Sequence, residues 1–221
     1  MQDINQVIEA IEGEIRELFS RDSSGHDIYH LKRTLNIATH LQEIEGGDKM
    51  VVAISAFVHD VHRIIQNNTG EYCSPKDSLP MIEKILKKVG LDEKVISGVL
   101  HCVEFHEEYG FSENGKTVKD KESLIIQDAD NLDAMGAVGV ARAFAFAGTK
   151  NIPMWLPDLP LERETFDEWA ADPSEIHHFY SKLLKLKDNM NTNTAKEMAQ
   201  RRHEFLEHFL SEFFYEWAGK T

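Results

Sequence analysis

The chain has 221 residues, of which 42% are hydrophobic, and a formal net charge of −14. The hydrophobic share is typical of a folded globular protein and excludes a disordered chain. The acidic balance argues against nucleic acid as a partner, but it is compatible with a small phosphorylated substrate, because a bound cation can reverse the local field. With two cysteines, no visible signal sequence and no run of roughly 18 apolar residues, we expect a cytoplasmic protein without a membrane span.

Apolar residues recur every three to four positions along most of the chain, which predicts helices almost throughout. The predicted helices lie at about 2–20, from Ser23 or Ser24 to Gly46, at about 48–66, from Asp77 or Ser78 to Gly90, at about 92–108, from Leu124 into an acidic cluster, between Gly136 and Gly148, and at about 193–218. No alternating strand pattern, internal repeat or clear linker stands out. These patterns predict an all-α fold in a single domain.

The most informative feature is a His-Asp pair, His59 and Asp60, inside a stretch that is apolar on nearly every side. Such a helix belongs in a core, where a histidine and a carboxylate are costly to bury unless something pairs with them. One metal ion would satisfy both groups. Candidate partners are His30 upstream and an acidic cluster downstream: Asp128, Asp130 and Asp133.

A short connection joins the helix of His30 to the helix of His59, which favours antiparallel packing and could bring the two imidazoles together. Asp130 ends an apolar run and is the preferred fourth ligand, while Asp128 stays open as its rival. Two imidazoles and two carboxylates suit Mn, Fe, Co, Ni or Zn, and tolerate Mg less well. His106 lies one turn beyond Val103 on a buried face and is a further candidate site residue.

Three segments resemble the HD-domain superfamily of metal-dependent phosphohydrolases, whose ordered signature is His, then His-Asp, then Asp. These segments are 26–33, 56–61 and 127–134, the last followed by the small-residue run 136–139. The C-terminal part, 178–196, resembles a bacterial and archaeal branch of uncharacterised HD hydrolases. The resemblance implies an HD-domain-like helical bundle. It also implies one HD-type domain over 1–221, with the metal-site core at about 23–135 and a C-terminal helical extension at about 136–221.

The resemblance further implies a divalent metal ion (Mn, Fe, Co, Ni, Zn or Mg) and the hydrolysis of a phosphate ester or nucleotide by a metal-activated water. The implied metal ligands are His30, His59, Asp60 and Asp130. Asp60 would also orient the water. His106 matches a histidine that relatives place near the substrate or a second metal, so it could stabilise the phosphoryl group or protonate the leaving oxygen. Arg33 and Arg63 are candidate substrate-binding residues.

Three points leave alternatives open. Arg63 occupies the position where some HD nucleotide hydrolases carry a catalytic glutamate; an arginine there could hold phosphate, or the protein could be a non-catalytic metal- or nucleotide-binding sensor. His62 lies beside the motif and could serve a second metal. The long helix at about 193–218 could instead form an interaction surface, including that of a homodimer. Glu107 and Glu108 are expected on the solvated surface.

Overall fold

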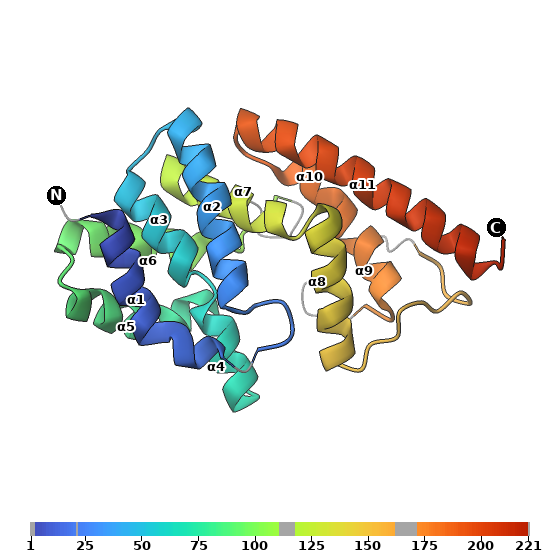
Figure 1. The fold of residues 1–221 in the computed structure, drawn as a ribbon, viewed down its shortest axis with the longest axis horizontal. Coiled ribbons are helices and arrows are strands. Elements are labelled where there is room, and N and C mark those ends of the chain that lie inside the picture. The colour runs from blue at the N-terminus through green and yellow to red at the C-terminus, as the bar shows by residue number, and fades with distance from the viewer. Residues whose placement is uncertain (1–2, 21, 111–117, 162–171, 221) are drawn as a thin grey trace.

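The computed structural model describes residues 3–20, 22–110, 118–161 and 172–220, and every regular element in these ranges is a helix (Figure 1). The elements are α1 (Ile4–Phe19), α2 (Ile28–Glu45), α3 (Lys49–Val58), α4 (Val61–Thr69), α5 (Pro75–Val89), α6 (Glu93–Phe105), α7 (Lys121–Asp133), α8 (Gly136–Thr149), α9 (Glu175–Ser181), the short 3₁₀ helix η1 (Leu183–Lys185), α10 (Leu186–Asn189) and α11 (Asn193–Trp217). The predicted all-α fold is confirmed.

Aspartate side chains begin most of the helices in the first half of the chain. Each accepts a hydrogen bond from a backbone N–H of the first turn, which satisfies a donor that the helix itself leaves free. These caps are Asp3, Asp27, Asp48, Asp92 and Asp120. Helix α5 instead begins with a capping box between Ser74 and Asp77, with Pro75 in the first turn. It therefore starts about one turn earlier than the sequence predicted.

The chain breaks its helix at His59 and Asp60, where the sequence predicted one uninterrupted helix over 48–66. Asp60 has φ −92° and ψ 12°, outside the helical region, and α4 begins after it. The imidazole Nδ1 of His59 donates to the carbonyl of Ala56 (2.9 Å), and that of His62 donates to the carbonyl of His59 (3.1 Å). Side-chain donors thus take carbonyls that a continuous helix would use. The single-helix prediction is wrong here, and the break turns two neighbouring side chains toward one point.

Helix α3 lies at the centre of the N-terminal half. Its residues from Val51 to Val58 are all buried, and it packs against α1, α2, α6 and α7. Burying a side chain such as Phe57 stabilises the fold by about 1.5–3 kcal/mol. Because α2 also packs against α7, the three helices that carry the predicted site residues meet in this core.

The C-terminal half is built from α8 to α11, and α7 leads directly into it (Figure 1). Helix α11 packs along α8 and also contacts α7 and α2, so it ties the two halves together. Aromatic rings fill the space between these helices; they include Phe144, Phe179, Phe209 and Phe213. The two chain ends lie at opposite ends of the molecule in Figure 1.

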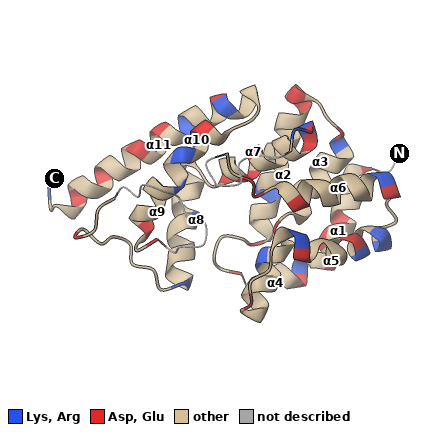
Figure 2. Cartoon of the chain, turned by 180° about the vertical axis from the view of Figure 1, so that it is seen from behind, with Lys and Arg blue, Asp and Glu red and all other residues tan. Residues whose placement is uncertain are grey.

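None of the helices in the described ranges is both long enough and apolar enough to cross a membrane. Figure 2 shows acidic residues beside basic ones along helices such as α5 and α11. This mixed pattern, like the net charge of −14, differs from the basic face that a nucleic-acid-binding surface requires.

Candidate metal centre

Four side chains from three separated segments converge in the interior of the N-terminal half. The Nε2 atoms of His30 and His59 lie 3.1 Å apart. His30 Nε2 lies 3.2 Å from Asp60 Oδ2 and 3.5 Å from Asp130 Oδ1. His59 Nε2 lies 3.6 Å from the same Asp130 oxygen. The structure therefore brings together the four residues that the sequence analysis selected as ligands, whose binding of a metal stays a prediction.

The hydrogen bonds of the two imidazoles show that this arrangement fits a cation. His30 Nδ1 donates to Asp133 Oδ2 (2.8 Å), and His59 Nδ1 donates to the Ala56 carbonyl (2.9 Å). In neutral rings both Nε2 atoms then carry lone pairs, which face each other and two carboxylates. Four electron-pair donors this close repel one another unless a positive charge lies among them. His, Asp and water form a normal ligand set for a divalent transition metal.

The electrostatics of the group point the same way. Although burial alone would raise the pKa of Asp60 and Asp130, the neighbouring histidines hold the pKa of both well below its usual range. Burial would lower the pKa of His59, but Asp60 and Asp130 raise it to about 9. The field at this point therefore favours a positive charge, whether a proton or a metal ion.

Asp133 holds the His30 ring from the side opposite the centre. Its carboxylate accepts the His30 bond and is itself bonded by Arg33 through Nε (2.8 Å) and Nη2 (3.0 Å), and by Arg142 through Nη1 (2.9 Å). Carboxylates in this position fix the tautomer and direction of a metal-binding imidazole. Arg33 thus lies behind His30, and its predicted contact with substrate phosphate stays a prediction.

His26 was not selected from the sequence, yet it donates through Nδ1 to Asp60 Oδ2 at 2.6 Å. Its neighbour Asp27 caps α2 by accepting the backbone N–H of His30 (2.9 Å). The dipeptide thus fixes both the start of α2 and the direction of the Asp60 carboxylate. The sequence signal for this role of His26 was that His26-Asp27 repeats the His-Asp dipeptide of residues 59 and 60.

Asp128, the rival of Asp130, faces a different part of the molecule. It is fully buried and accepts hydrogen bonds from the backbone N–H groups of Asn191 (2.7 Å) and Thr192 (2.8 Å) and from the Thr192 hydroxyl (2.8 Å). It therefore anchors the start of α11, while Asp130, two residues later on α7, faces the histidines.

A second group of acceptors adjoins the first. Ligand atoms of Asp60, His62 and His106 all lie within 4.8 Å of one another. His106 Nδ1 donates to the Val103 carbonyl (2.7 Å), which leaves Nε2 of the neutral ring as an acceptor, and His62 Nδ1 donates to a carbonyl of the chain break. Within the described part of the chain, neither buried Nε2 has a hydrogen-bond partner. Burial lowers the pKa of His106 to about 4, so its ring is neutral near pH 7.

The expectation that Glu107 is solvated surface is wrong. Its side chain is 17% exposed, forms an ion pair with Arg63 and lies 3.4 Å from His62 Nε2. Although burial would raise the pKa of Glu107, Arg63 holds it far below its usual range. Arg63 is therefore not a free surface cation, and it lies next to the second group of acceptors.

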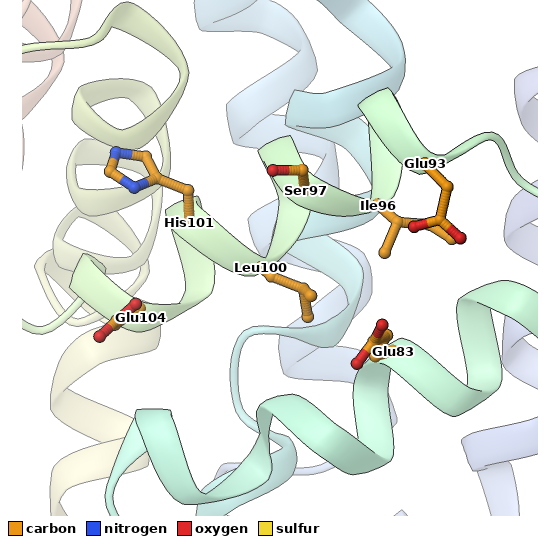
Figure 3. A pocket seen from close by; sticks show the side chains of 7 residues that line it. All are labelled: Glu83, Glu93, Ile96, Ser97, Leu100, His101 and Glu104. Carbon is orange, nitrogen blue, oxygen red and sulfur yellow. The ribbon is translucent and has the colours of Figure 1, made fainter.

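Two surface pockets lie apart from this centre. One, with a volume of about 410 Å³, lies between α5 and α6 and is lined by Glu83, Glu93, His101 and Glu104 (Figure 3). Its three carboxylates would repel a phosphate. The other, of about 450 Å³, is lined by Arg33 and small residues of α8 and lies behind Asp133. Neither contains any of the four converging residues.

Comparisons with known proteins agree with the geometry. A sequence model of the HD domain matches residues 27–135. The chain is 33% identical over 213 residues to the uncharacterized protein YpgQ of Bacillus subtilis, covering 95% of this chain and 93% of that protein. Its fold is similar to that of an HD-superfamily hydrolase from Bacillus thuringiensis (32% identity, 99% of this chain and 100% of the other, TM-score 0.72). It is also similar to B. subtilis YpgQ crystallised with ADP (29% identity, 97% of both chains, TM-score 0.69).

Proposed function

This chain belongs to the HD-domain family, and from that premise we propose that it is a metal-dependent phosphohydrolase acting on a nucleotide-like substrate. The observation that carries the proposal is the convergence of two imidazole Nε2 atoms and two carboxylates, separated by 3.1 to 3.6 Å, in the interior. The residues that would hold the divalent cation are His30, His59, Asp60 and Asp130.

When bound, a divalent cation lowers the pKa of a coordinated water and offsets negative charge on a phosphoryl group. The chain's own residues supply position and proton acceptors. Asp60, held by His26 at 2.6 Å, presents a fixed carboxylate that can accept a hydrogen bond from the attacking water. His106 presents an unprotonated Nε2 beside Asp60, so His106 can accept a proton or bind a second cation. It can donate a proton to the leaving group only after it has first accepted one.

A nucleotide-like substrate is supported by the ADP in the crystals of B. subtilis YpgQ, which is a relative of this chain over almost its full length. The relative is uncharacterized, so its ligand supports a substrate class rather than a reaction. The second candidate function rests on Arg63, which stands where some HD nucleotide hydrolases carry a catalytic glutamate and is held in a partly buried ion pair with Glu107. That alternative is a sensor that binds nucleotide without cleaving it.

The test is a screen of nucleotides and phosphate esters with protein loaded in turn with each candidate divalent metal. The wild type should hydrolyse at least one compound, and Asp60→Ala should lower turnover by at least about 100-fold even when metal is in excess. Asp92→Ala, which removes an exposed helix cap far from the centre, should leave turnover intact. Full activity of metal-replete Asp60→Ala would contradict the scheme. Saturable nucleotide binding without turnover under every metal would establish the sensor instead.

A further inference from the structure

Lys182 connects the C-terminal helices to the rim of the metal centre. It lies where α9 ends and η1 begins, well outside the residues 27–135 that match the HD domain. Its ammonium nitrogen lies 4.5 Å from the centroid of the Tyr109 ring. Tyr109 is itself buried and follows His106 by three residues. A cation from the second half of the molecule is thus packed against the turn that carries a candidate catalytic histidine.

Within the described ranges, no ion pair neutralises the positive charge of Lys182. Among the residues that the structure describes, no carboxylate lies within 4.0 Å of its ammonium group. Burial alone would lower the pKa of Lys182, but Tyr109 raises it above its usual value, so the group is charged at neutral pH. Arg63 also has an unused hydrogen-bond donor, because its buried Nε has no partner within the described ranges. Glu107, which interacts with both cations, offsets only one of them.

The two cations lie on a path that begins at the metal centre. Arg63 interacts electrostatically with Asp60 at one end and with Lys182 at the other. Tyr109, against which Lys182 packs, interacts with Asp130. Arg63 therefore lies within electrostatic reach of the candidate ligands, and Lys182 lies within reach of Arg63. A phosphate at the centre that is linked to further phosphates can extend past Arg63 to Lys182.

Resting on the proposed function, we propose that Lys182, together with Arg63, binds a second phosphate group of the substrate, so that the protein prefers nucleoside di- and triphosphates to phosphate monoesters. Lys182 is then a specificity-determining residue supplied by the helices outside the HD domain. Its ammonium group is a compact positive charge with three hydrogen-bond donors. It can therefore bind the oxygens of a substrate phosphate that is not the one being hydrolysed.

The experiment compares Lys182→Met, Lys182→Arg and the matched control Lys185→Met, each as the full chain loaded with Mn²⁺. Binding of ADP is measured by calorimetry, and KM and kcat are measured for ADP, ATP and p-nitrophenyl phosphate. Loss of one charged hydrogen bond predicts that Lys182→Met weakens ADP binding and raises KM for ADP and ATP by about 10- to 100-fold. The kcat/KM for p-nitrophenyl phosphate should stay within about twofold. Lys182→Arg should recover most of the loss, and Lys185→Met should resemble the wild type.

The outcomes separate this inference from the proposed function. Unchanged ADP binding and KM in Lys182→Met would overturn the role of Lys182 while leaving the hydrolase in place. An equal loss on p-nitrophenyl phosphate, or an equal loss in Lys185→Met, would also overturn it, because the effect would then be structural or a matter of general charge. If the wild type neither binds ADP nor cleaves any phosphate compound, both proposals fail.

Discussion

Replacing Asp133 by Asn tests whether a buried carboxylate behind His30 prepares the metal centre. Asp133 is 2% exposed and accepts four hydrogen bonds, three of them from the guanidinium groups of Arg33 and Arg142. Breaking a fully buried ion pair costs about 3–5 kcal/mol. Because the Arg33 side chain is 33% exposed and is partly screened by solvent, we expect about 2–3 kcal/mol here. Loss of the fixed tautomer of His30 should also weaken metal binding by about 10- to 100-fold.

The matched control is Asp128→Asn, the same substitution on the same helix. Asp128 is equally buried but holds Asn191 and Thr192, just before α11, rather than touching the centre. Asp128→Asn should lower the free energy of unfolding by about 1–2 kcal/mol and leave metal affinity unchanged. Urea unfolding of the chelated proteins and calorimetric titration with Mn²⁺ give the two quantities separately. Wild-type metal affinity in Asp133→Asn, or an equal loss of affinity in Asp128→Asn, would refute the reasoning.

Two further predictions concern buried titratable groups. His106→Ala should lower kcat by about 10²- to 10⁴-fold while the first metal ion stays bound. A change confined to KM would contradict a proton-transfer role for His106. Loss of a second metal equivalent on elemental analysis would assign His106 to a second cation. Glu175→Gln should change how stability depends on pH, because burial, with Asp172, raises the pKa of Glu175 from 4.5 to about 8. The folded state then keeps a proton that the unfolded state releases, so wild-type stability falls by up to about 5 kcal/mol as pH rises through that window. Thermal unfolding at pH 5, 7 and 9 should show a smaller fall in the variant than in an exposed control, Glu197→Gln, and parallel profiles would exclude this role.

The helices were predictable because their signals are local. Apolar spacing, aspartate caps and glycines act within one or two turns, so a single stretch of sequence carries them. The buried His-Asp pair pointed to a site, but the set His30, His59, Asp60 and Asp130 came from the resemblance to the HD signature, and their ligation of a metal stays a prediction. The break at His59 escaped prediction because no proline or glycine marks it. It arises from imidazole donors that bond to backbone carbonyls, and helix periodicity does not reveal them.

The residues that support the centre were harder to find for a different reason. Glu107 lies next to another glutamate, which is typical of a solvated surface, and only the approach of α4 supplies Arg63 as its partner. Lys182 is one of several lysines in the segment 182–187, and packing against Tyr109 sets it apart. Such pairings join residues 44 and 73 positions apart, as 107 − 63 and 182 − 109 show. No periodicity within one segment can reveal them.

The charges of the site imply an order of binding. The two carboxylates of the centre, Asp60 and Asp130, carry two negative charges at neutral pH, since the pKa of each is far below its usual range, and a proton on His59, whose pKa is raised to about 9, offsets only one of them. A phosphate approaching the metal-free centre would therefore be repelled at close range, in an interior where Coulomb forces are weakly screened. A divalent cation cancels these two charges, and only then do Arg63 and Lys182 leave a net attraction for the substrate. ADP should accordingly bind the metal-loaded protein far more tightly than the chelated one, and by linkage it should tighten the hold of the centre on its metal.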